Sequence, residues 1–144
     1  MAYLNIYILI DDLSNCYKNK FLDMIKNKKY KVLCFDIDNT ICESKTNNYK
    51  ESKPIFKNIE FINKLYAKGY YVKIFTARFM GRAKEKISLA KKMDNGLTKK
   101  QLKKWGLKYH VLYFGKPSYD LFVDDKALNF KKNWIKDLKN KLKI

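Results

Sequence analysis

The sequence predicts an α/β fold in which helices cover both faces of a parallel sheet. Short apolar runs alternate along the chain with segments of helical periodicity, and this alternation is typical of parallel strands joined by right-handed crossovers. A length of 144 residues is sufficient for one ordinary hydrophobic core. Because the two prolines and five glycines form no tract, no linker is indicated. We therefore expect one domain over residues 31–144, preceded by an N-terminal extension over residues 1–30.

Four apolar runs, each followed by polar residues, predict buried strands. They cover residues 31–35, 70–75, 110–114 and 121–123. In the extension, residues 5–10 fit an added edge strand, and residues 21–25 fit part of a helix laid over the sheet.

A helix is predicted between the first two strands. Ser52 and Pro54 are typical of a helix start, and Gly69 is typical of the residue that follows a helix end. The segment between them places four apolar side chains on one helical face, namely Ile55, Ile59, Ile62 and Tyr66.

Further helices are predicted later in the chain. Residues 83–93 are helix-like, and Thr98 with Gln101 forms a predicted capping box for a helix that stops at Gly106. A last helix would share one apolar face among Trp134, Leu138 and Leu142. Together with the strands, these helices predict a Rossmann-like sheet.

Chemically active side chains follow all four predicted strands. The carboxyl ends of parallel strands meet at one edge of the sheet, where ligands of such folds bind. The residues at these ends are Asp36, Asp38, Thr76, Lys116, Asp124 and Asp125. An isolated pair such as Asp36 and Asp38 is more readily explained by a turn with an Asx cap. The hydroxyl, cation and second carboxylate pair at the other strand ends favour a shared catalytic site.

The order of these motifs resembles that of the haloacid dehalogenase superfamily. Its four motifs correspond here to DIDNT, the strand-terminal Thr76, Lys116 and the Asp124–Asp125 pair, over residues 31 to about 130. More narrowly, the stretches FDIDNTIC, FTAR, YHVLYFGKP and YDLFVDDKALN resemble small phosphatases associated with bacterial capsule and surface-polysaccharide synthesis. The resemblance implies the core fold of that superfamily and phosphatase activity.

The resemblance also assigns a role to each residue. Asp36 would attack phosphorus and form an aspartyl-phosphate, which divides a difficult hydrolysis into two displacements. Asp38 would act first as general acid and then as general base. The Thr76 hydroxyl and the Lys116 ammonium would hold the phosphoryl oxygens and offset their charge.

A magnesium ion is the expected cofactor, because Mg²⁺ prefers oxygen ligands and retains several waters. The expected ligands are the Asp36 carboxylate, the Asp38 main-chain carbonyl and the Asp124 carboxylate. Asp125 would position a water molecule or share the coordination.

Arg78 and Arg82 are the two arginines of the chain and follow Thr76 closely. A planar guanidinium there could bind a second anionic group of the substrate. The alternative is a structural salt bridge.

Members of the superfamily often select substrates with a cap domain inserted after the first or second motif. Here residues 41–69 contain a polar loop and one helix, and residues 78–109 contain a helical pair, so no substantial cap is expected. The site should be open, closed in part by residues 43–53 or by a neighbouring subunit. We expect a small phosphorylated metabolite or sugar phosphate as substrate, in surface-polysaccharide synthesis.

The formal net charge of +18 keeps two alternatives open. One is a nucleic-acid end phosphatase, and the other is a non-catalytic basic binding module. All but two of the 32 basic residues are lysines, scattered without an arginine-rich or aromatic-interleaved stripe. We therefore expect a solvated lysine coat, and nucleic acid as a possible partner that is not favoured.

The remaining signals place the chain in a reducing compartment. Three cysteines form no metal-binding spacing and no even disulfide set. The apolar residues 3–10 are too few to cross a membrane and lack the features of a signal peptide. A cytoplasmic protein without a membrane partner is expected, with His110 and Cys42 serving in packing.

Overall fold

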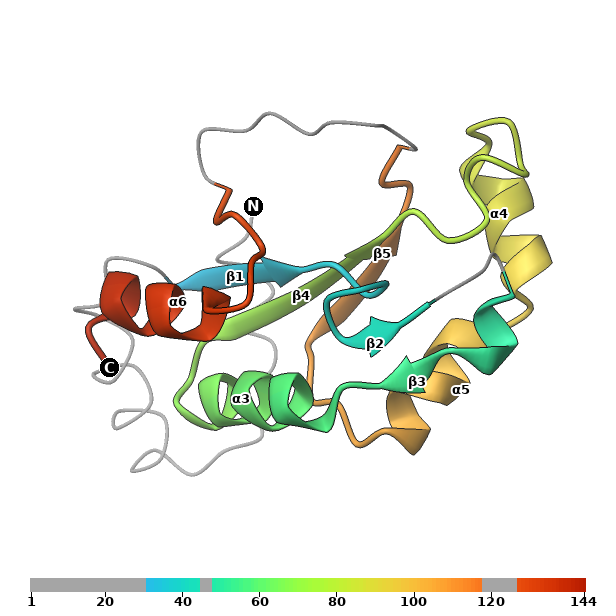
Figure 1. The fold of residues 1–144 in the computed structure, drawn as a ribbon. Coiled ribbons are helices and arrows are strands. Elements are labelled where there is room, and N and C mark those ends of the chain that lie inside the picture. The colour runs from blue at the N-terminus through green and yellow to red at the C-terminus, as the bar shows by residue number, and fades with distance from the viewer. Residues whose placement is uncertain (1–30, 45–47, 118–126) are drawn as a thin grey trace, which may run out of the picture.

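The computed structural model describes residues 31–44, 48–117 and 127–144. A parallel sheet with the order β1-β4-β5 lies at its centre (Figure 1). Its strands are β1 (Val32–Phe35), β4 (Tyr71–Thr76) and β5 (Val111–Phe114). Three predicted strands are thereby confirmed to within one residue. The fourth predicted strand, over residues 121–123, and the extension over residues 1–30 lie outside the described residues.

Helices join these strands and follow them. The α3 helix (Phe56–Ala67) connects β1 to β4, and the pair α4 (Ile87–Asp94) and α5 (Leu97–Lys104) connects β4 to β5. The α6 helix (Trp134–Leu142) lies near the carboxyl terminus. No helix among the described residues is long and apolar enough to span a membrane.

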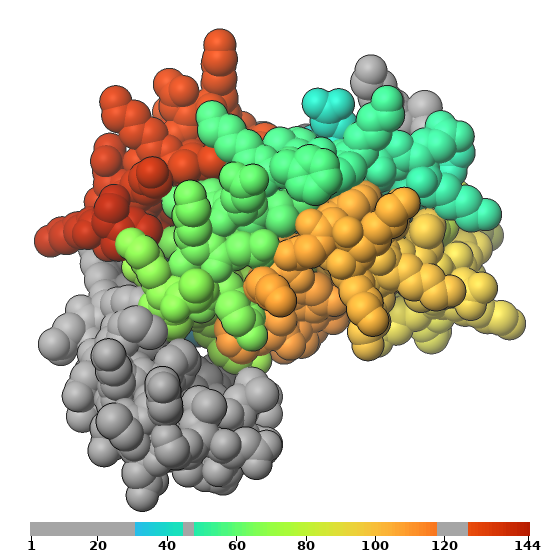
Figure 2. Space-filling view, turned by 90° about the horizontal axis from the view of Figure 1, so that it is seen from below, coloured from blue at the N-terminus to red at the C-terminus, as the bar shows by residue number. Residues whose placement is uncertain are grey.

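The main core lies on one face of the sheet. The rings of Phe35 in β1 and Phe61 in α3 both contact Trp134 of α6, with centroids 6.2 and 5.8 Å away. Leu102 of α5 is buried in the same cluster. Figure 2 shows the surfaces of α3, α5 and α6 side by side, in green, orange and red. The predicted helical cover is therefore present on this face.

The opposite face of the sheet remains partly open. Val32 is 40% exposed and Tyr113 is 46% exposed on this side. Lys73 lies between the rings of Tyr71 and Tyr113, with its Nζ 5.9 Å from each centroid. Because Val32 and Tyr113 stay exposed, the predicted helical cover of the second face is not seen in the described residues.

A hairpin replaces the predicted start of the first helix. The short strands β2 (Cys42–Glu43) and β3 (Lys53–Pro54) pair in antiparallel fashion, and the 3₁₀ turn η1 (Tyr49–Glu51) precedes β3. The prediction that Ser52 and Pro54 begin the helix was therefore wrong. Pro54 pairs with Cys42, α3 begins two residues later, and the Ser52 hydroxyl contacts Ser44 and Arg78 instead of a helix amide.

The capping box predicted for α5 was also wrong. Gly96, with φ of 75°, precedes the helix, and Thr98 lies inside it. The carboxylate of Asp94 accepts hydrogen bonds from the Thr98 amide, at 3.1 Å, and from its hydroxyl. The preceding helix thus supplies the cap, and Thr98 is left to face the protein interior. Residues 83–86 were predicted as helical, but 83–85 form turns and Lys86 is extended before α4 begins.

His110 packs between two aromatic rings, as predicted. The ring centroids of Tyr66 and Tyr71 lie 4.5 and 4.3 Å from that of the imidazole. The Nδ1 atom accepts a hydrogen bond from the Val72 amide at 3.0 Å, so the ring is neutral with its proton on Nε2. Burial lowers the pKa of His110.

Candidate active site

The ends of three strands meet around Asp36. This residue directly follows β1, and its Oδ2 accepts a hydrogen bond of 2.7 Å from the Nζ of Lys116, which follows β5. The main-chain amide of Lys116 donates to the carbonyl of Thr76 at the end of β4, at 3.3 Å. The Asp36 side chain is 34% exposed and that of Lys116 only 12%. Three of the residues predicted from separate strand ends are thus brought together.

Gly115 directs Lys116 back toward Asp36. Its φ of 104° lies in a region that residues with a side chain avoid. A Cβ atom at this position would lie 2.7 Å from Cδ1 of Ile87, the first residue of α4. The turn after β5 therefore depends on glycine, both for its backbone and for the close approach of α4.

A tight turn follows Asp36 and carries Asp38. The carbonyl of Ile37 accepts hydrogen bonds from the amides of Thr40, Ile41 and Cys42, at 3.2, 2.7 and 3.1 Å. The Asn58 side chain in α3 donates to the Thr40 carbonyl at 2.7 Å, which ties this turn to the helix. The loop over residues 36–42, called the nucleophile loop for the role predicted for Asp36, is therefore held by hydrogen bonds within itself and from α3.

Asp38 forms a two-pronged ion pair with Arg78. The Nε of Arg78 lies 3.0 Å from Oδ2, and its Nη2 lies 2.8 Å from Oδ1. The Ser44 hydroxyl donates to the same Oδ1 at 2.6 Å. The Asp38 side chain is 23% exposed, whereas that of Arg78 has no exposed surface. The carboxylate thus reaches the surface while its partner lies beneath it.

The rest of the Arg78 guanidinium is held by four further side chains. Its Nη1 donates to Gln101 at 2.7 Å and Thr98 at 3.3 Å, and its Nη2 contacts Cys42 and Ser52. Burial alone would lower the pKa of Arg78, but the hydrogen bonds and the charge of Asp38 raise it. All N–H groups of the guanidinium face protein acceptors. The geometry therefore favours the structural salt bridge over substrate binding for Arg78.

Arg82 has a different environment. Its guanidinium carbon lies 5.3 Å from the ring centroid of Tyr49 and 5.0 Å from that of Phe79. The side chain is exposed. Stacking on two rings orients a planar cation without covering it. Arg82 therefore remains a candidate contact for a second anionic group.

Thr76 and Cys42 are fully buried beside this network. The Thr76 hydroxyl accepts a hydrogen bond of 3.1 Å from the Arg78 amide, which leaves its own proton to donate. Burial raises the pKa of the Cys42 thiol, so it remains protonated and packs as predicted.

The described residues contain part of the predicted magnesium site. No group of three or more potential His, Cys, Asp or Glu ligands occurs among them, and the predicted ligands Asp124 and Asp125 lie outside them. The main-chain amide of Cys42 donates a hydrogen bond to the Ile37 carbonyl, and the Cys42 carbonyl accepts one from the Asn39 amide. The Asp38 carbonyl therefore takes no part in this bridge. This carbonyl and the half-exposed Asp36 carboxylate are hard oxygen donors, which fit Mg²⁺.

Four polar residues of the site were missed in the sequence: Ser44, Ser52, Thr98 and Gln101. Thr98 and Gln101 flank Leu102 on the buried side of α5, and that placement of polar groups on an apolar face was the available signal. It was interpreted as a helix cap because the capping pattern has the same spacing.

Comparison with known proteins gives one informative likeness. The fold matches the crystal structure of a structural-genomics target from Vibrio cholerae with a TM-score of 0.65. The match covers 77% of this chain and 98% of the other at 24% sequence identity, so it shows the fold alone. No protein-family model matches the chain. No curated protein matches it either.

Proposed function

We propose that this chain is a Mg²⁺-dependent phosphomonoester hydrolase of the haloacid dehalogenase type, with Asp36 as its nucleophile. The observation that carries the proposal is the 2.7 Å pair between Asp36 and Lys116, formed by residues 80 positions apart at the ends of two parallel strands. The partly exposed Asp36 carboxylate beside the nearly buried Lys116 ammonium is suited to receive a phosphoryl group, because the ammonium offsets the negative charge of that group.

The reaction would proceed in two displacements. A carboxylate oxygen of Asp36 attacks phosphorus, the bond from phosphorus to the ester oxygen breaks, and Asp38 gives its proton to the departing alcohol. Water then attacks the aspartyl-phosphate, Asp38 takes a proton from it, and the bond to Asp36 breaks to release phosphate. Lys116 and Thr76 bind the phosphoryl oxygens. A magnesium ion held by Asp36, the Asp38 carbonyl and Asp124, with Asp125 beside it, would reduce the repulsion between nucleophile and substrate.

Arg78 would support this mechanism by orienting Asp38. Oδ1 of Asp38 receives the Ser44 hydroxyl and the Arg78 Nη2, whereas Oδ2 receives only the Arg78 Nε. Oδ2 therefore keeps more capacity for proton exchange. The buried guanidinium holds the carboxylate in one rotamer, which is what an acid–base group needs for proton transfer in a fixed direction.

A small phosphorylated metabolite or sugar phosphate remains the proposed substrate, with a role in surface-polysaccharide synthesis. The β2–β3 hairpin and the α4–α5 pair are too small to form a cap domain, which supports an open site. A nucleic-acid end phosphatase is the second candidate, favoured by a basic groove beside the nucleophile loop that is described below.

Hydrolysis of an aryl phosphate tests the activity. Wild-type protein should release phosphate in proportion to added Mg²⁺, and chelation should stop the release. Asp36→Asn should lower kcat by about a thousandfold or more, because the amide is no nucleophile. Glu60→Gln, at an exposed position of α3, is a control that should keep wild-type turnover. Full turnover in Asp36→Asn, or none in the wild type with Mg²⁺, would contradict the proposal.

A further inference from the structure

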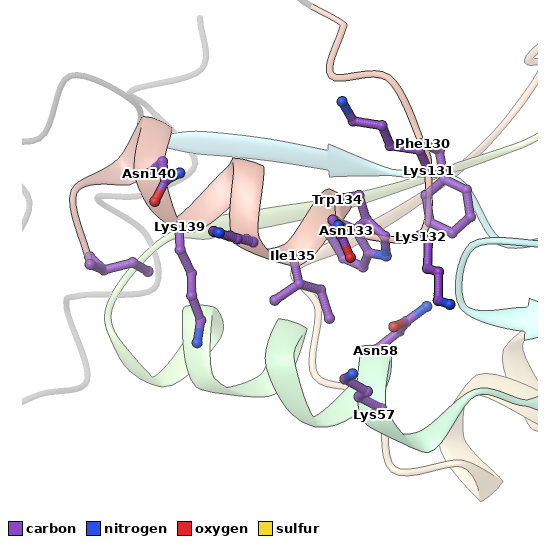
Figure 3. Close-up of a pocket in the computed structure, with 12 residues that line it drawn as sticks. Lys57, Asn58, Phe130, Lys131, Lys132, Asn133, Trp134, Ile135, Lys139 and Asn140 are labelled. Carbon is purple, nitrogen blue, oxygen red and sulfur yellow. The ribbon is translucent and has the colours of Figure 1, made fainter.

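A groove between α3 and α6 carries an unusual surface. It has a volume of about 820 Å³, within the range of ligand-binding sites. Its lining contains five lysines and no Asp or Glu side chain. The lining includes Lys57, Asn58, Phe130, Lys132, Trp134 and Lys136. Figure 3 shows lysines of both helices and of the segment before α6 around the hollow.

The charge of the groove is largely uncompensated. Lys131 pairs with Asp137 at 3.3 Å and is set aside for that reason. Lys57, Lys132 and Lys136 are exposed, and none forms an ion pair with a carboxylate in the described part of the chain. The first turn of α3, where Lys57 lies, contains no acidic residue, so the positive end of the helix dipole adds to the lysines. These lysines differ from a scattered lysine coat because they line one groove.

The groove also offers an aromatic surface. Phe130 is 47% exposed, and its ring packs against that of Trp134 at 5.6 Å, so a rigid ring supports the exposed one. Flat exposed rings beside a basic track are typical of sites for single-stranded nucleic acid, in which phosphates contact lysines and unpaired bases stack. The bases of a duplex are already stacked and would not use Phe130.

Two contacts join the groove to the candidate active site. Asn58 lines the groove and donates to the Thr40 carbonyl in the nucleophile loop. Trp134 lines it and packs against Phe35, the residue that precedes Asp36. A polymer bound in the groove would therefore lie beside the carboxyl end of β1.

We infer that this groove binds single-stranded nucleic acid through its phosphate backbone, with one base stacked on Phe130. The inference goes beyond the proposed hydrolysis and does not depend on it. The bound strand would supply the substrate class of the second candidate function if its end carries a phosphate.

Fluorescence anisotropy tests the binding, with a labelled single strand of about 12 nucleotides that lacks a terminal phosphate. Chelator is present, so hydrolysis plays no part. In the variant Lys57→Gln/Lys132→Gln/Lys136→Gln, Kd should rise at least about tenfold, and the slope of log K against log salt should flatten by about 2. The matched control Lys99→Gln/Lys100→Gln/Lys103→Gln removes the same charge from exposed positions of α5 and should change both much less.

A second variant tests the stacking. Phe130→Leu keeps an apolar contact with Trp134 but loses the flat ring, and it should weaken binding of the single strand about tenfold. Inorganic polyphosphate should bind less tightly than the oligonucleotide and be insensitive to Phe130→Leu. Equal losses in the two lysine variants, wild-type affinity in Phe130→Leu, or equally tight binding of a duplex would each overturn the inference. Far-UV circular dichroism spectra and thermal melts that match the wild type would confirm that the groove variants are folded.

Discussion

At the scale of single residues, Arg78 has the most unusual position. It is a fully buried cation that donates hydrogen bonds to five side chains from four segments of the chain. Removing one partner of such a pair costs far more than the pair itself contributes, because the other charge is left without compensation. Arg78 therefore matters to stability and to the orientation of Asp38 together.

Substitution of Arg78 separates these two effects. Arg78→Lys keeps the charge but loses the planar fork, so kcat for aryl phosphate should fall at least about tenfold with little change in KM. Arg78→Met should lower the free energy of unfolding by about 3–5 kcal/mol, measured by urea denaturation. A rise in KM without a change in kcat for Arg78→Lys would instead support the substrate-binding role of Arg78. Arg82→Lys, measured in parallel, tests whether Arg82 contacts a second anionic group of the substrate.

His110 gives a prediction on pH. Its pKa is lowered in the folded state, so the unfolded chain binds the proton more readily. The contribution to stability is complete above the unfolded pKa of about 6.5 and is lost as the pH falls through the folded pKa. His110→Asn keeps an acceptor for the Val72 amide and should show a shallower loss of stability below about pH 6.5. Parallel pH profiles for the two proteins would contradict this.

The sequence predicted the site residues that lie at the carboxyl ends of strands. Asp36, Thr76 and Lys116 were identified because parallel strands bring their carboxyl ends together whatever the details of packing. Ser52 and Thr98 were misassigned because Ser and Thr suit both a helix start and a buried hydrogen bond. The partner that they share, Arg78, lies 20 or more positions away and leaves no local signal.

At the scale of elements, strand positions were predicted better than helix starts. The apolar runs of β1, β4 and β5 locate each strand within one residue, because the apolar residues that predict a strand lie within the strand itself. The start of α3 depends instead on the pairing of Pro54 with Cys42, and the start of α5 on the Asp94 carboxylate. These are contacts with neighbouring elements, which local propensity does not describe.

The turn between β5 and Lys116 provides a test at this scale. Gly115→Ala combines an unfavourable φ with a contact to Ile87, so it should destabilise the protein by about 1–3 kcal/mol. It should also lower turnover, because Lys116 is displaced from Asp36. Gly106→Ala is the matched control, since its φ is 73° and nothing lies within 4 Å of the added Cβ. Thermal melts should show destabilisation in both variants, and kinetics should show a defect in Gly115→Ala alone. Equal turnover in the two would contradict this role for the turn.

At the scale of the whole molecule, the proposed catalytic residues and the hydrophobic core occupy different parts of one sheet. The helices α3, α5 and α6 bury one face, while the strand ends carry Asp36, Thr76 and Lys116.

The Arg78 network has a consequence for the order in which the protein assembles. Asp38 is held by a side chain from the end of β4, which is itself held by α5 and by the segment before β3. The Arg78–Asp38 contact joins positions 40 apart, about the separation of the paired strands β1 and β4, so it closes with the sheet, after the local helices have formed. A chain that has formed its helices but not the sheet and the Arg78 network would hold Asp38, the proposed proton donor, in no fixed direction. Turnover would then begin only at the last stage of folding, so the appearance of activity would report a completed structure.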